Sequence, residues 1–178
     1  MNMGQTLLTF AAMTILSLAI LNVNRTLSNC DITLSQSRYR MEALSILNSY
    51  IAQASQHYFD EVTTDTSSEK TLNDFTQANS FGFDADDYGI IDDFDDYHNY
   101  VIADTGQSGV IYNIAFKVDY VQISGNKVVP IGNRAYHKRM TISIYDTYDP
   151  PLLSREVNGA KVNDSLKVDF VYSYWFYN

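Results

Sequence analysis

Acidic side chains are concentrated in one stretch of this 178-residue sequence. Residues 60–104 contain 13 aspartates and glutamates against a single base, Lys70, which gives the stretch a net charge of −12. Because the whole chain carries −9, the remainder is mildly basic at +3. Clustered carboxylates can coordinate a divalent cation, or act as acids and bases where a pocket holds them. A cation site is therefore the first chemistry that this sequence suggests.

Part of this stretch, from Asp84 to Asp95, resembles an EF-hand calcium loop. Asp84, Asp86, Asp92 and Asp95 stand at positions one, three, nine and twelve of such a loop, with a glycine at position six. Position five is a tyrosine instead of Asp or Asn, and no clear helices flank the segment. We take these four aspartates as candidate calcium ligands, and a solvated acidic loop is the alternative. The sequence predicts no other cofactor.

Other chemistry finds little support among the residues. The three histidines, His57, His98 and His137, have no spacing typical of a metal site, and the glycines are too scattered for a phosphate-binding loop. The single cysteine, Cys30, excludes an intramolecular disulfide and any zinc site built on several thiolates. The acidic balance and the lack of a basic block argue against nucleic acid as a partner. We expect a protein that is not an enzyme.

An uncharged apolar segment precedes the acidic stretch. The first charged side chain is Arg25, and Met3 to Val23 is long enough to cross a bilayer, which needs about 20 helical residues. We predict that residues 1–24 form a transmembrane or filament-core helix, with membrane lipid as its partner. Its apolar surface is built from Leu7, Leu8, Phe10, Ile15, Leu16, Leu18, Ile20 and Leu21. A buried core helix and a cleaved signal peptide are the alternatives, although Asn22 to Arg25 offers no small-x-small cleavage site.

The next segment, residues 25–64, has the pattern of an amphipathic helix. Apolar residues recur every three or four positions, at Leu44, Leu47, Ile51, Ala54, Tyr58 and Val62. Weak helix formers between residues 22 and 31 leave two alternatives open: one long helix with a loosened middle, or two helices joined by a short linker. Residues 65–104 then form an acidic loop region whose aromatic side chains we expect to hold it against the folded body.

Strand patterns dominate residues 105–178, for which we predict an antiparallel β-sheet head. Large apolar residues alternate with polar ones from Val110 to Tyr120, at Met140, Ile142 and Ile144, and from Leu166 to Phe176. Ser124 to Lys127 reads as a tight turn into Val128 and Val129. Strands with one apolar face need a cover, which the long helix supplies. The predicted fold class is α+β: a long N-terminal helix, hydrophobic and then amphipathic, packed on a C-terminal antiparallel sheet.

This layout resembles that of type IV pilins and pseudopilins. Met3-Gly4 before the apolar run is similar to the glycine that precedes the prepilin cleavage point, which implies processing between Gly4 and Gln5. Residues 91–98, IDDFDDYH, resemble an acidic stretch of minor pilins of the mannose-sensitive haemagglutinin type. The chain departs from the pilin pattern at Gln5, where Phe or Met is typical, and at Thr9, where most bacterial pilins have Glu.

The resemblance implies a structural role. It predicts a subunit of a type IV pilus-like or pseudopilus filament, anchored in the membrane by its N-terminal helix before assembly. The head would then be extracytoplasmic, at the cell surface or in an extracellular filament, with like subunits or other pilin-like subunits as partners. The alternative is a single-pass, membrane-tethered binding or assembly protein that does not polymerise.

Overall fold

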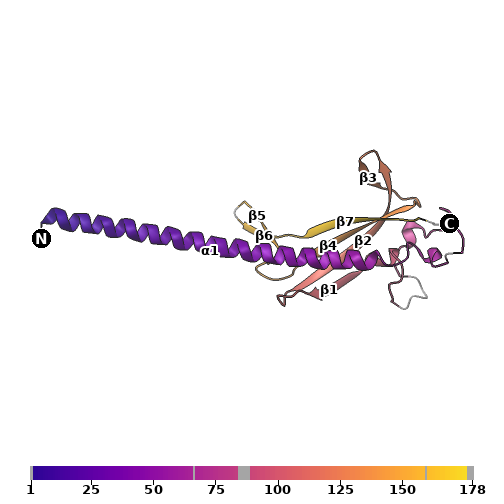
Figure 1. The fold of residues 1–178 in the computed structure, drawn as a ribbon, viewed down its shortest axis with the longest axis horizontal. Helices are drawn as coiled ribbons and strands as arrows, with labels where there is room; N and C mark the ends of the chain where they lie inside the picture. The colour runs from indigo at the N-terminus through magenta and orange to yellow at the C-terminus, as the bar shows by residue number, and fades with distance from the viewer. Residues whose placement is uncertain (1, 66, 84–88, 159, 176–178) are drawn as a thin grey trace. The chain divides into compact units, whose positions relative to one another are not determined.

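The computed structural model describes residues 2–65, 67–83, 89–158 and 160–175. The chain forms two units, Met1–Tyr39 and Arg40–Asn178, and we call the second the globular unit. A single helix, α1 (Met3–Ala54), accounts for the first unit and contributes its last turns to the globular unit (Figure 1). The long N-terminal helix and the antiparallel sheet described below confirm the α+β fold class.

Helix α1 is continuous through residues 22–31, so neither a loosened middle nor a linker is present there. Two threonine hydroxyls in and beside this part of the helix bond back to the preceding turn. Thr26 Oγ1 donates to the carbonyl of Asn22 and Thr33 Oγ1 to that of Asn29, each at 2.9 Å. Such back-bonds give the side chains a partner without breaking the helix.

The prediction of helix up to residue 64 was wrong, because α1 ends at Ala54. Tyr58 and Val62 therefore lie outside the helix, although their spacing continues its pattern. Tyr58 instead forms a parallel bridge with Asp93. The amide of Phe94 donates to the Tyr58 carbonyl at 2.9 Å. A backbone bond to a distant segment thus replaces the next helical turn.

The region predicted as loop, residues 65–104, contains regular structure. Two short 3-10 helices, η2 (Ala78–Ser80) and η3 (Asp95–Tyr97), lie within it, and η1 (Glu61–Thr63) precedes it. Strand β1 (Val101–Thr105) takes up its last residues, so the prediction that the sheet begins at residue 105 was wrong. The strand was missed because its side chains alternate only between exposed and half-buried, which leaves no strong apolar period.

The main sheet has strand order β1-β2-β4-β7, and all its pairs are antiparallel. Strands β2 (Ile111–Ser124), β4 (His137–Tyr145) and β7 (Leu166–Ser173) form its centre and one edge. Strand β3 (Lys127–Pro130) returns from the predicted turn and pairs with the end of β2. Strands β5 (Ser154–Val157) and β6 (Ala160–Asn163) make a separate hairpin that the alternation did not predict. Strand β7 ends at Ser173, and Phe176 lies outside the described residues.

The last turns of α1 cover the sheet within the globular unit, where Figure 1 shows the helix running along the strands. Ala43, Leu47 and Ala54 are buried on that side. The ring of Tyr50 meets that of Phe116 on β2, with centroids 5.4 Å apart. The covered face therefore forms a core between helix and sheet.

The predicted alternation is confirmed on the two central strands. On β2 every second residue from Tyr112 to Tyr120 is buried, and on β4 the same holds for Met140, Ile142 and Ile144. One buried residue of this apolar face carries a charged side chain, although its position follows the same alternation. Lys138 lies opposite Tyr120 in the register and has no exposed surface at all.

Candidate functional site

The predicted anchor residues lie along the first half of α1, and all of them are exposed. The side chains of Leu7, Leu8, Phe10, Ile15, Leu16, Leu18, Ile20 and Leu21 are between 52% and 72% accessible. Length and composition make this the one helix in the described part of the chain that could cross a membrane. A signal sequence has the same properties, so the segment is compatible with either a membrane anchor or a signal sequence.

Polar residues within the apolar segment are compatible with lipid. The hydroxyls of Thr6, Thr9 and Thr14 each donate to a carbonyl three residues earlier at 2.8 Å, and Ser17 Oγ donates to the Met13 carbonyl at 2.9 Å. Each hydroxyl therefore has a partner within the helix, which lowers the penalty of moving it into hydrocarbon. Gly4 and Gln5, at the processing site that the resemblance implies, lie in the first turn, where the Gln5 amide donates to the Asn2 carbonyl at 2.8 Å.

Only two of the four candidate calcium ligands, Asp92 and Asp95, lie within the described residues, so the calcium site stays a prediction. Asp84 and Asp86 lie outside those residues. Asp95 forms an ion pair with Lys138. The neighbouring Asp93 stabilises the local turn, because its Oδ1 accepts from the amides of Asp95 and Asp96 at 2.8 and 3.1 Å. In the part of the chain that the structure describes, no group of three or more potential ligands could hold a metal ion.

What the structure does bring together is a buried cluster around Lys138, which sequence reasoning missed. The ammonium Nζ donates to the Phe59 carbonyl at 2.6 Å, to Asp60 Oδ2 at 2.8 Å and to Asp95 Oδ1. All three N–H bonds thus have acceptors. The side chains of Lys138 and Asp60 are fully buried, and that of Asp95 is 4% exposed.

Asp60 is the most heavily bonded carboxylate of this cluster. Besides Lys138, it accepts from the backbone amide of Thr76 at 3.0 Å and from the Thr76 hydroxyl at 3.1 Å. Tyr120 Oη lies 3.5 Å from Asp60 Oδ2 and donates to the Thr76 carbonyl at 2.8 Å. The Asp60 carboxylate thus receives hydrogen bonds from Lys138, Thr76 and Tyr120.

A second carboxyl pair adjoins the ammonium. Asp93 is tied to Asp95 through the backbone, since its Oδ1 accepts from the Asp95 amide at 2.8 Å. Burial, followed by the charge of Asp95, raises the pKa of Asp93 to about 8. Burial also raises the pKa of Asp95, to about 6, against the opposing effect of Lys138. Asp93 and Asp95 therefore retain a proton more readily than ordinary aspartates do.

Aromatic rings enclose the ammonium on its remaining sides. Lys138 Nζ lies 4.6 Å from the ring centroid of Phe59, 5.2 Å from that of Phe81 and 5.5 Å from that of Tyr120. Ring faces attract a cation, and they also exclude the water that would solvate it. The buried ammonium is therefore surrounded by aromatic rings, and its charge acts through a medium of low polarity.

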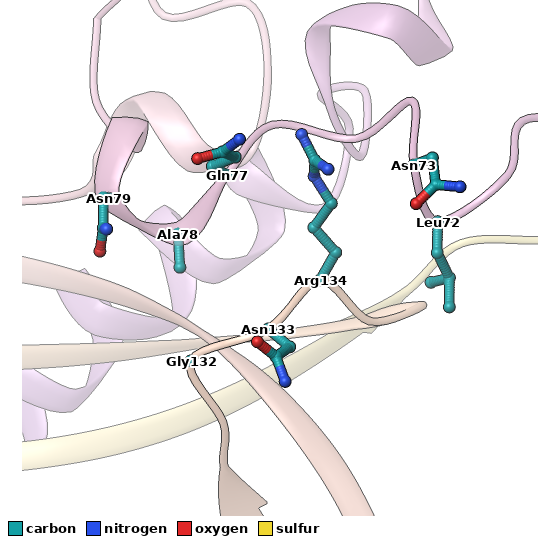
Figure 2. Close-up of a pocket in the computed structure, with 8 residues that line it drawn as sticks. All are labelled: Leu72, Asn73, Gln77, Ala78, Asn79, Gly132, Asn133 and Arg134. Atoms are coloured by element: carbon teal, nitrogen blue, oxygen red, sulfur yellow. The ribbon is translucent and has the colours of Figure 1, made fainter.

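A polar cavity of about 380 Å³ opens elsewhere on the globular unit, between residues 72–79 and 132–134. Figure 2 shows the guanidinium of Arg134 extending between Gln77 and Asn73. Among the described residues, Arg134 Nε is buried and has no hydrogen-bond partner. The other polar groups are carboxamides, which bind but do not react. We regard this cavity as a polar hollow and the Lys138 cluster as the chemically distinctive site.

The Lys138 cluster could have been found from alternation alone. Residue 138 falls in the same period as Met140, Ile142 and Ile144, so a strand with those residues inward must point Lys138 inward too. Its partners could not have been chosen in this way, because they come from segments 78 and 43 residues away.

No protein-family model, curated protein or solved structure matches this chain. Its function must therefore be inferred from the apolar segment of α1 and from the globular unit.

Proposed function

We propose that this protein is a structural subunit of a type IV pilin-like or pseudopilin-like filament, held in the membrane by the start of α1 before assembly. The observation that supports this most strongly is the apolar surface of residues 3–23, none of which is buried by the rest of the chain. A folded domain in water does not leave so long an apolar surface open without a partner.

The distribution of apolar residues around the helix favours lipid and then other helices as that partner. Leu7, Leu8 and Phe10, like Ile15, Leu16 and Leu18, occupy successive directions around the axis and are all exposed. A helix lying on a single surface would instead be apolar along one stripe. Small residues, Ala11, Ala12, Ser17 and Ala19, allow close approach of neighbouring helices, as they also do in ordinary transmembrane segments.

The apolar side chains of this helix can be surrounded by lipid, by water or by other helices, and this choice favours filament growth. In the bilayer, lipid solvates its side chains. Once the subunit leaves the bilayer, each exposed leucine side chain would lose about 1.5–3 kcal/mol in water unless another helix covered it. Identical helices packed in a repeated, non-closing contact build an open filament. The departures at Gln5 and Thr9 mean that subunit register would not depend on the usual pilin glutamate.

The test compares two aspartate substitutions on the same helix in cells that produce the protein. Leu16→Asp places a charge in the apolar segment, whereas Ser37→Asp places it at an exposed polar position beyond the segment. The proposal predicts that Leu16→Asp removes the subunit from sheared surface filaments and that Ser37→Asp does not. Wild-type protein that is found only as a detergent-solubilised monomer or small complex would favour the non-polymerising tethered protein instead.

A further inference from the structure

The Lys138 cluster combines the groups that amide formation between two side chains requires. An amine must lie against a carboxyl carbon, a base must take its proton, and an acid must assist the departure of oxygen. Lys138 contacts Asp95, Asp60 Oδ2 lies 2.8 Å from the same nitrogen, and Asp93 Oδ1 accepts from the Asp95 amide at 2.8 Å. Aromatic rings and burial keep water, the competing nucleophile, away from the site.

From this geometry we propose that Lys138 and Asp95 join through an intramolecular isopeptide bond, formed by the protein itself, that links β4 to η3. Asp60 is the proton acceptor for the Lys138 ammonium, and Asp93 assists at the Asp95 carboxyl. The proposal does not depend on filament assembly.

The reaction balances without any external reagent. The ammonium of Lys138 transfers one proton to Asp60, which frees the nitrogen lone pair to attack Cγ of Asp95. Asp93, whose pKa is raised by burial, lends its proton to the Asp95 carboxyl, which is thereby activated as an acid. The C–N bond forms, the nitrogen gives up a second proton, and one carboxyl oxygen leaves with two protons as water. Asp60 and Asp93 end in the protonation states in which they began.

Electrostatics favours the product over the ion pair. Three carboxyls, those of Asp60, Asp93 and Asp95, are buried around one ammonium. Burying charges is unfavourable even when they are paired, and condensation eliminates one positive and one negative charge from the site. The new amide N–H can still donate to the Phe59 carbonyl or to Asp60, both of which already accept from the same nitrogen.

Intact-mass spectrometry of the full-length protein, purified in detergent, tests the bond. Wild type is compared with Lys138→Arg, so that any processing of the N-terminus cancels in the difference. We expect the wild type to be lighter than the arginine variant by the residue difference and, in addition, by one water. A difference that equals the substitution alone would overturn the proposal and leave an ion pair.

Peptide sequencing locates the bond and keeps the test valid if a variant fails to fold. Proteolysis of the wild type should release a branched peptide that joins Lys138 to Asp95. A water loss that maps to any other pair of residues, Asp60 included, would refute the assignment. Asp95→Asn should still react but release ammonia instead of water, and Asp95→Ala should show no mass loss. Asp60→Ala should slow or abolish the reaction, and a variant that reacts as fast as wild type would remove Asp60 from the mechanism.

Discussion

The ammonium of Lys138 lies 2.8 Å from the carboxylate of Asp60, and neither side chain has any exposed surface. The contact joins β4 to the segment that follows α1, while Asp95 attaches η3 to the same nitrogen. Three parts of the globular unit that are distant in sequence therefore meet at the buried nitrogen of Lys138. Removing this side chain should therefore destabilise the whole globular unit.

Lys138→Met should destabilise the globular unit by about 3–5 kcal/mol, because it leaves the buried carboxyls of Asp60 and Asp95 without the nitrogen that binds both. Lys117→Met is the matched control, since Lys117 is 61% exposed and its pair with Asp119 on the same sheet should contribute less than about 1 kcal/mol. Denaturant unfolding of the full chain in detergent measures both. Equal losses for the two variants would show that the buried cluster does not stabilise the fold.

The pH dependence of stability should reveal Asp93. Burial and the charge of Asp95 raise its pKa from 3.8 to about 8, so between these values the folded chain binds more protons than the unfolded chain. The contribution of Asp93 to stability is therefore largest at low pH and is lost as pH rises toward 8.

Asp93→Asn retains the oxygen that accepts from the amides of Asp95 and Asp96 but removes the titration. Between pH 4 and 8 the free energy of unfolding should fall less steeply for the variant than for wild type. The difference in favour of the variant should be largest near pH 8. Asp74→Asn is the control. Hydrogen bonds from Thr71 lower the pKa of this exposed carboxyl, whereas the pKa of Asp93 is raised. Parallel wild-type and Asp93→Asn profiles would contradict the raised pKa.

Gly106→Ala should disturb the contact between α1 and the sheet. A Cβ at this position would lie 2.5 Å from Cδ of Glu42, whose carboxylate accepts from the Ser108 amide at 2.6 Å. Overpacking of this kind costs roughly 1–3 kcal/mol. Gly132→Ala is the control, since a Cβ there meets no atom within 4 Å. Thermal unfolding should separate the two, and a Gly106→Ala midpoint equal to that of wild type would mean that Glu42 moves aside freely.

The elements predicted well from sequence are those with a strong apolar period. Residues 112–120 and 140–144 alternate so regularly that the buried face of β2 and β4 could be assigned residue by residue. The long helix was predicted as well, although its end was not, because the bridge between Tyr58 and Asp93 depends on a segment far along the chain. Strands β1, β5 and β6 carry mostly exposed side chains and left no comparable signal.

The candidate site was harder to predict for a physical reason. Sequence reasoning treated the aspartates of residues 60–96 as ligands or solvated charges, because carboxylates are usually exposed. Burial of Asp60, Asp93, Asp95 and Asp96 is possible only because Lys138 and backbone amides supply their partners. Those partners are defined by tertiary structure and not by local spacing.

The central claim, that this chain assembles through the start of α1, is tested most directly by electron cryomicroscopy of filaments sheared from cells that produce it. We predict helical filaments in which residues 3–23 of successive subunits pack against one another at the centre and the globular units face outward. Filaments built through the globular units, with the apolar segment absent from the contacts between subunits, would contradict the account.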